Sequence, residues 1–219
     1  MEMQEEKQRG YSMPRIGDKA PDFQANTTQG PITFSEYNKN HWVILFSHPA
    51  DFTPVCTTEL SRFAQEKDYF EKQNTKLIGL SVDSIHSHVA WVHNVREKMG
   101  IYMDFPIIAD LTMDVAKKYG MIHPGEDSTA AVRAVFFIDP KGVIRLIMYY
   151  PLNIGRNMDE IKRVLKALQI SDENQVALPI DWKEGEKVIV PPPKTLDEME
   201  DRDKSDYEKV DFYLMKKDI

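Results

Sequence analysis

The segment VILFSHPADFTPVCTTEL, from Val43 to Leu60, constrains the fold more than any other part of this chain. Its unbroken apolar beginning is typical of a strand that is buried on both faces of a sheet. Pro49 and Pro54 then stiffen a loop, and Thr57 is the expected first residue of a helix. Cys56, the single cysteine of the chain, therefore lies between a buried strand and a helix N-terminus, where free amide groups and the helix dipole favour a thiolate.

Strand and helix patterns alternate along the rest of the chain. Continuous apolar runs predict the strands, and apolar residues at helical spacing predict the helices. A strand, a helix and a second strand in succession predict a right-handed crossover between parallel strands, whereas the turn at residues 139–142 (DPKG) predicts an antiparallel hairpin. The expected strands are residues 32–34, 42–47, 77–82, 105–109, 134–138 and 143–149, and the expected helices are residues 57–72, 84–99, 113–119 and 157–168.

Together these patterns predict an α/β fold, a thioredoxin-like mixed central sheet flanked by helices, with a smaller C-terminal extension. Residues 1–13 are expected to form a flexible polar arm, residues 14–170 the main domain and residues 171–219 the extension. The extension is rich in proline and charge and carries an aromatic patch at Phe212 and Tyr213. Because it has few residues with which to build a core, we expect it to pack on a partner subunit.

The balance of charge restricts the classes of partner. The formal net charge is −7, which argues against nucleic acid or an anionic membrane surface. The N-terminal residues contain no apolar leader segment, and nowhere do about eighteen apolar residues follow one another, so we expect a cytoplasmic protein without a membrane span. A single cysteine cannot form an intramolecular disulfide, which agrees with a reducing compartment.

Three histidines of one expected helix, His86, His88 and His93, are candidate metal ligands. On a helix, however, the side chains of His86 and His88 point away from each other, and no HExxH motif or cysteine cluster accompanies them. We therefore expect solvated histidines and no metal site.

Two kinds of function remain open from these residues alone. A lone cysteine is most often a small buried apolar residue, so the chain could be a thioredoxin-like binding protein or chaperone-type oligomer in which Cys56 is incidental. Thr53, the prolines and the helix start around Cys56 instead favour a reactive thiol. Arg133 and Glu59 have ordinary interpretations too, as a solvated charge and as an acid favoured by the helix dipole.

The spacing of Pro49, Thr53 and Cys56 closely resembles the Pro-x-x-x-Thr-x-x-Cys signature of peroxiredoxins. The similarity extends from about Ile16 to Lys194 and continues weakly through the tail, so residues 14–170 correspond to a peroxidase domain. The segments that carry it are FSHPADFTPVCTTEL, LIGLSVDS, FPIIAD, AVRAVFFIDPKG, YYPLNIGRNMDEI and PIDWKEGEKVIVPPP, which resemble the one-cysteine subfamily, also called the peroxiredoxin-six group.

The resemblance implies a thiol peroxidase. In such an enzyme the Cys56 thiolate attacks the distal oxygen of hydrogen peroxide or an organic hydroperoxide and becomes a sulfenic acid. The resemblance further implies that the Thr53 hydroxyl binds both thiolate and peroxide, that Pro49 shields the sulfur from water, and that Arg133 holds the thiol deprotonated. The backbone amides of Val55 and Cys56 would complete the anion site.

Further residues and partners follow from the same resemblance. Glu59 and Arg156 match positions that orient Arg133, and His48 stands where the subfamily keeps a histidine beside the substrate pocket. No cofactor is expected. Because the chain has no second cysteine, an external thiol (thioredoxin, glutathione or a small thiol) is expected to reduce the sulfenic acid. Packing of the extension on a partner subunit predicts a homodimer, and the resemblance adds that dimers can assemble further into a homodecamer.

Overall fold

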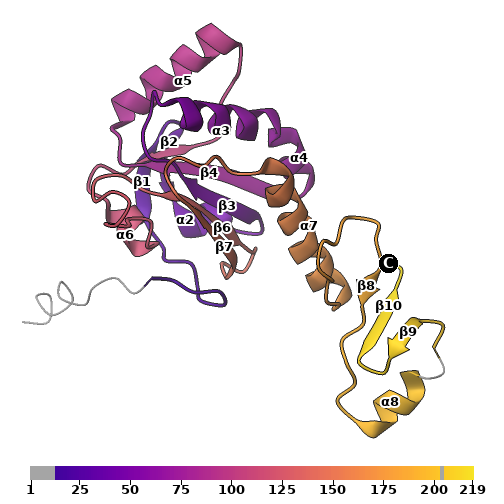
Figure 1. Cartoon of the computed structure of the whole chain (residues 1–219). Helices are drawn as coiled ribbons and strands as arrows, with labels where there is room; N and C mark the ends of the chain where they lie inside the picture. Colours follow the sequence, from indigo (N-terminus) through magenta and orange to yellow (C-terminus); the bar gives the residue numbers. More distant parts are fainter. Residues whose placement is uncertain (1–12, 203–204) are drawn as a thin grey trace, which may run out of the picture. The chain divides into compact units, whose positions relative to one another are not determined.

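The computed structural model describes residues 13–202 and 205–219 (Figure 1). The polar arm expected over residues 1–13 therefore falls, apart from Met13, outside the described residues. The chain divides into two compact units, the first ending at Arg156 and the second beginning at Asn157. Among the described residues, no helix has the length and apolar character needed to cross a membrane.

Within the described residues, the first unit contains a seven-stranded mixed sheet. Strand β3 pairs in parallel with β4, and β4 with β5, as the predicted crossover requires. Strand β6 runs antiparallel to β3 and to β7, which confirms the predicted hairpin. The strands are β1 (Gln24–Thr27), β2 (Gly30–Thr33), β3 (Trp42–Ser47), β4 (Thr75–Ser81), β5 (Ile107–Ala109), β6 (Arg133–Ile138) and β7 (Ile144–Tyr150), in the spatial order β2-β1-β5-β4-β3-β6-β7.

Helices cover both faces of this sheet (Figure 1). Because successive side chains of a strand point to opposite faces, β3 contributes to two cores. Leu45 belongs to the core that includes Phe34 and Val115, whereas Phe46 stacks on Phe63 with ring centroids 3.9 Å apart. The thioredoxin-like α/β fold is thus confirmed. The helices of this unit are α2 (Phe34–Asn38), α3 (Pro54–Gln65), α4 (Lys67–Lys72), α5 (Ile85–Met99) and α6 (Asp114–Lys118).

The helix after β3 begins earlier than the sequence predicted and is interrupted once. Pro54 is its first residue. Proline suits this position because its φ is fixed near the helical value, and because the N–H that it lacks would have no acceptor within the helix there. Thr53 is the N-cap, with an extended backbone. The single helix expected over residues 57–72 is two helices that meet at Glu66. Cys56 consequently lies within the first turn of α3 and not ahead of it.

Two short elements in the N-terminal part of the first unit were not predicted from the sequence. Strand β1 has the sequence QANT, which carries no apolar alternation, and it forms through backbone pairing with β2 and β5. Helix α2 has five residues, too few for a periodic pattern to be recognised.

The second unit contains helix α7 and the C-terminal tail. Ile170 of α7 packs with Val176, Trp182 and Val188 in a small core of its own, so α7, expected at the end of the main domain, belongs to this unit. Its strands form a three-stranded sheet in the order β8-β10-β9 that the charged sequence did not predict. The elements are α7 (Met158–Asn174), β8 (Val188–Ile189), α8 (Leu196–Arg202), β9 (Glu208–Asp211) and β10 (Leu214–Lys217).

Candidate active site

Cys56 is fully buried in the first turn of α3. The first main-chain hydrogen bond of this helix runs from the amide of Thr57 to the carbonyl of Thr53, at 3.0 Å. The amides of Val55 and Cys56 precede it and therefore have no acceptor within the helix. Free amides at a helix N-terminus favour an anion beside them, so the local backbone suits a thiolate or an oxyanion.

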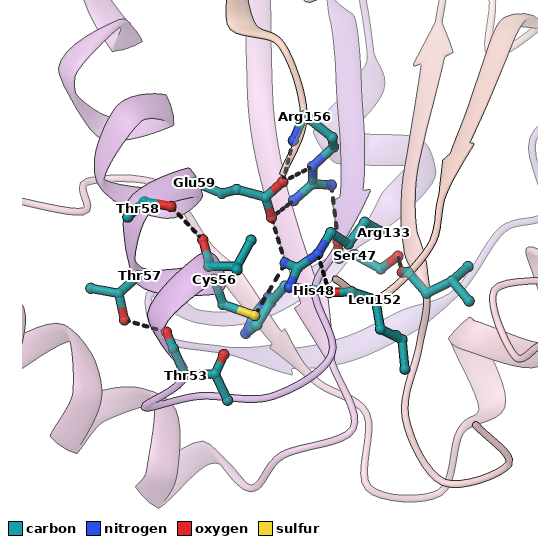
Figure 2. A network of polar contacts seen from close by, with 12 residues as sticks. Ser47, His48, Thr53, Cys56, Thr57, Thr58, Glu59, Arg133, Leu152 and Arg156 are labelled. Atoms are coloured by element: carbon teal, nitrogen blue, oxygen red, sulfur yellow. Dashed lines mark hydrogen bonds and ion pairs between the residues drawn. The ribbon is translucent and has the colours of Figure 1, made fainter. Parts of the chain in front are cut away.

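Arg133 brings a positive charge to this thiol. It is the first residue of β6 and only 2% exposed, and its Nη1 lies 3.3 Å from the sulfur of Cys56 (Figure 2). A cation at this distance favours the thiolate over the thiol. The structure therefore brings together the two residues, 77 positions apart, that the sequence placed in one pocket.

The guanidinium of Arg133 is fixed by acceptors on its other edges. Its Nε and Nη2 donate to the carbonyl of Leu152 at 2.9 and 2.7 Å, and its Nη1 also donates to Glu59 at 2.7 Å. Such a fork of hydrogen bonds holds the plane of the guanidinium in one orientation. The role of the Leu152 carbonyl could not be predicted, because a backbone acceptor leaves no mark in the sequence.

Glu59 joins Arg133 to a second arginine. Arg156 donates to Glu59 from its backbone amide, its Nε and its Nη2 at 2.7–2.9 Å, and its Nη1 donates to the carbonyls of Ser47 and Ala134 (Figure 2). Burial alone would raise the pKa of Glu59, but the charges and hydrogen bonds of Arg156 and the charge of Arg133 outweigh it and lower that pKa. Two buried cations and one carboxylate leave one excess positive charge, which an anion at Cys56 would balance.

The loop before α3 is held in a strained turn. Phe52 has a φ of 55°, in the left-handed region that costs a non-glycine residue roughly 1–2 kcal/mol. Two hydrogen bonds maintain the turn: the amide of Asp51 donates to Asp83 at 3.0 Å, and the hydroxyl of Thr53 donates to the carbonyl of Ala50 at 2.9 Å. The single hydrogen of the Thr53 hydroxyl is thus used within the loop, and its oxygen lone pairs remain to accept.

Pro49 and His48 follow β3 directly. Pro49 is half-buried, and its ring can make no hydrogen bond to water or substrate. His48 is fully buried, and its Nε2 lies 3.0 Å from a carboxylate oxygen of Asp51. Burial lowers the pKa of His48, against the opposing hydrogen bond and charge of Asp51.

The prediction that His88 is a solvated histidine is wrong. His88 is fully buried; its Nδ1 lies 2.8 Å from Asp51 and its Nε2 lies 3.0 Å from the carbonyl of Ile108. It shares the inward face of α5 with Trp91 and Val95, and this spacing of three and seven residues is the signal that sequence reasoning missed. His86 and His93, in contrast, are exposed, as predicted.

Among the described residues, a group of possible metal ligands also gathers here. His48, Asp51, Asp83 and His88 bring one ligand atom each to within 4.8 Å of one another. The two histidine–Asp51 contacts of 2.8 and 3.0 Å are hydrogen-bond distances, which make this group a hydrogen-bonded network.

Two family models match the chain. The AhpC/TSA family model covers residues 16–147, and the model of the C-terminal domain of 1-Cys peroxiredoxin covers residues 167–205. A peroxiredoxin of Aquifex aeolicus is 53% identical to this chain over 218 residues, which cover 95% of this chain and 98% of that protein.

Solved structures agree with these matches. A yeast mitochondrial 1-Cys peroxiredoxin has a TM-score of 0.86 and 43% identity, over 94% of this chain and 100% of that chain. A cysteine-to-serine mutant of the peroxiredoxin 6 of Arenicola marina has a TM-score of 0.85 and 37% identity, over 94% of this chain and 98% of that chain.

Replacing Glu59 by Gln should lower the free energy of unfolding by about 3 kcal/mol at neutral pH, because two buried guanidinium groups lose their counter-charge. Because folding lowers the pKa of Glu59, its contribution is present above the unfolded value of about 4.3 and is lost as the pH falls through the folded value. Urea titrations should therefore show the difference between the two proteins shrinking below about pH 4.

Glu66→Gln is the matched control for this measurement. Glu66 follows the end of the same helix and pairs with the exposed Arg62, and surface pairs of this kind contribute about 0–1 kcal/mol. An equal loss in both variants, or a Glu59→Gln loss that does not change with pH, would contradict the proposed charge balance.

Proposed function

Because this chain belongs to the AhpC/TSA family as a one-cysteine peroxiredoxin, a thiol peroxidase, we propose that it reduces hydrogen peroxide and organic hydroperoxides at Cys56. The thiolate sulfur attacks the distal peroxide oxygen, so that an S–O bond forms as the O–O bond breaks. The leaving hydroxide or alkoxide takes up a proton and departs as water or an alcohol. Cys56 is then a sulfenic acid.

The observation that carries this proposal is the charge of the buried cluster around the sulfur. The side chains of Arg133, Arg156 and Glu59 are each at most 4% exposed, and together they hold one more positive than negative charge. A buried charge without a counter-charge is costly. Cys56, 3.3 Å from Arg133, is the group that can supply the missing negative charge, and the thiolate is the nucleophile that the reaction needs.

The other predicted residues fit this reaction by their positions. The amides of Val55 and Cys56 can donate to a peroxide oxygen that gains negative charge in the transition state. The Thr53 hydroxyl, which donates to Ala50, keeps lone pairs that can accept the hydrogen of the peroxide. Pro49 has no N–H, and its ring offers neither a donor nor an acceptor to water, which supports its role as a shield.

An external thiol completes the cycle in this proposal. The thiol attacks the sulfenic sulfur, water leaves, and a mixed disulfide forms; a second thiol then releases reduced Cys56 together with the disulfide of the reductant. Cys56 is the only cysteine, so no other residue of this chain can take the first of these steps. Because this cycle needs reducing thiols, which the cytosol supplies, we also propose a cytoplasmic location.

Burial of the sulfur discriminates among the candidate reductants. The Cys56 side chain is fully buried, so a thiol on a large protein such as thioredoxin can reach it only if the first turn of α3 opens. A small thiol such as glutathione needs a narrower opening. The yeast relative is described as resolved by glutathione/thioredoxin systems, and we propose that this chain uses the same class of thiol.

We also propose that the enzyme is a homodimer that can assemble further into a homodecamer. The second unit exposes apolar side chains, with Ile180 at 90%, Leu196 at 73%, Val210 at 68% and Tyr213 at 56%. Exposed apolar surface of this kind favours association with a partner. This supports the expectation that the C-terminal extension packs on a second subunit.

Stopped-flow mixing with hydrogen peroxide tests the proposed reaction. One thiol per chain should be oxidised far faster than free cysteine, and Cys56→Ser should consume no peroxide. Thr53→Val should slow the oxidation by about 100-fold, because it removes a group that binds the reacting peroxide, whereas Thr53→Ser should keep most of the rate.

The same experiment separates the peroxidase from a thioredoxin-like binding protein. If wild-type Cys56 reacted no faster than free cysteine, or if Cys56→Ser still consumed peroxide, the catalytic assignment would fail. Client holding that survived Cys56→Ser would show a second, independent role.

Intact-mass spectrometry of the sulfenic form identifies the reductant. Mixing with glutathione should give a mixed disulfide on Cys56, and excess glutathione should return the free thiol. Opening of α3 should limit reduction by thioredoxin, so its rate should level off as the thioredoxin concentration rises. A rate that rises linearly with thioredoxin throughout would contradict this difference in access.

Sedimentation velocity tests the assembly. The wild type should sediment as a dimer or larger at micromolar concentration, and replacing exposed Phe212 and Tyr213 by Ser should weaken association. The matched control is Tyr102→Ser, an exposed aromatic of the first unit. A wild-type monomer at this concentration would contradict the proposal.

A further inference from the structure

A second buried polar network, formed by His48, Asp51 and His88, lies outside the arginine cluster. The carboxylate of Asp51 is shared: one oxygen lies 3.0 Å from His48 Nε2, and the other lies 2.8 Å from His88 Nδ1. Both histidines are fully buried, and Asp51 is 7% exposed. A buried network of this kind must satisfy its hydrogen bonds internally, so its protons can be assigned from its partners.

The network reaches the thiol pocket through His48. The sheet pairs Phe46 with Val135, and this antiparallel register continued by two residues sets His48 opposite Arg133. The amide of Ala134 donates to the hydroxyl of Ser47 at 3.1 Å, which joins the two segments one residue beyond the last paired residues of the strands. Figure 2 shows the side chain of His48 behind the Cys56 sulfur in this view.

The protons of His88 follow from its two contacts. Nε2 faces the carbonyl of Ile108, which only accepts, and Nδ1 faces a carboxylate oxygen of Asp51. Burial alone would raise the pKa of Asp51, but hydrogen bonds from His48 and His88 outweigh it and lower that pKa to about 2, so Asp51 is ionised. Both contacts of His88 are thus acceptors, and a ring with hydrogen on both nitrogens would satisfy them and balance the charge of Asp51.

The protons of His48 are arranged differently. Nε2 faces Asp51 and must donate, whereas Nδ1 is buried and has no partner among the described residues. A hydrogen on Nδ1 would be a buried donor without an acceptor, which is costly. Burial lowers the pKa of His48, and the charge of His88 adds to this effect, against Asp51 and the more distant Asp83. His48 is therefore neutral, with a bare lone pair on Nδ1.

We propose that Asp51 and His88 are positioning residues for the peroxidase site: His88 balances the charge of Asp51, and this keeps His48 neutral with Nδ1 as an acceptor in the thiol pocket. The inference deepens the proposed function, because it concerns the surroundings of Cys56 as the reacting thiol. Without the charge of His88, the buried carboxylate of Asp51 draws a second proton onto His48. His48 then adds a second positive charge near Cys56, beside that of Arg133.

Nitrogen-15 solid-state NMR of histidine-labelled protein tests the proton assignment without any peroxide. The Cys56→Ser protein serves as well as the wild type, so this test is independent of catalysis. At neutral pH His48 should show one protonated and one bare nitrogen, and His88 should show two protonated nitrogens. Single substitutions of the six histidines assign the signals.

Asp51→Asn sharpens the assignment. Its amide oxygen can accept from His48 Nε2 while its NH₂ group donates to His88 Nδ1. His88 should therefore lose one hydrogen, and His48 should keep its tautomer. Wild-type His48 with hydrogen on Nδ1, or a neutral His88 in the wild type, would overturn the proposal.

His88→Leu tests the effect on the thiol. With His48 now cationic beside the thiolate, the pH midpoint of Cys56 oxidation by peroxide should fall by about one unit. The rate at high pH should fall by about threefold, because a thiolate stabilised by one unit is a weaker nucleophile. Combining Asp51→Asn with His88→Leu removes both charges and should restore the wild-type midpoint. A loss of packing alone would not be reversed by this second change.

His93→Leu is the matched control, since it makes the same substitution on the exposed face of α5 and should leave the profile unchanged. If His88→Leu does not fold, NMR of the wild type and Asp51→Asn decides the question. Stoichiometric zinc in the purified protein, lost in His88→Leu, would replace the proposed network by a metal site. An unchanged midpoint in folded His88→Leu would also overturn it.

Discussion

The contact between the Arg133 guanidinium and the Cys56 sulfur is the interaction on which the site depends. It is one edge of a hydrogen-bonded fork whose other edges are held by Glu59 and the Leu152 carbonyl. Since Glu59 is also bound by Arg156, the position of the sulfur's partner is set by Glu59, Leu152 and Arg156 together. In the proposed function the Cys56 thiolate is the anion that balances the excess buried cation, so the reactivity of the thiol and the stability of the folded state depend on the same charge balance.

Sheet topology explains why residues so far apart in sequence meet. Strand β3 is followed by the loop and helix that carry Cys56, and parallel α/β sheets place such sites at the carboxyl ends of their strands. Because β6 is antiparallel to β3, its first residue lies at the edge where β3 ends. Arg133 is that first residue. A parallel β6 would place Arg133 at the opposite edge of the sheet, so the hairpin that makes this sheet mixed also completes the site.

The helices and strands that could be predicted from the sequence are those with a long apolar run or a long periodic pattern. Strands β3, β4, β6 and β7 and helices α5 and α7 were predicted, because each is a continuous apolar run or a periodic stripe. The predicted start of α3 at Thr57 is too late, because a proline is as typical of a loop as of a first helical position, which Pro54 occupies. The prediction that His88 is solvated was wrong because it rested on the polarity of histidine and did not use the three-residue spacing between His88 and the buried Trp91. The polar partners of Arg133 and His88 in the backbone, Leu152 and Ile108, carry no sequence signal at all.

The two polar networks supply the pocket with both hydrogen-bond donors and hydrogen-bond acceptors. Arg133 and the amides at the start of α3 present donors, which suit the sulfur anion and the oxygen that leaves with negative charge. His48, as proposed, presents a bare nitrogen, and the Thr53 oxygen has lone pairs free. A hydroperoxide has one hydrogen to donate and two oxygens to accept, so a pocket that offers both donors and acceptors can hold it with its O–O bond in a single orientation. If His48 were cationic, the hydrogen of the peroxide would lose one of its two acceptors at the moment when the O–O bond must align with the sulfur.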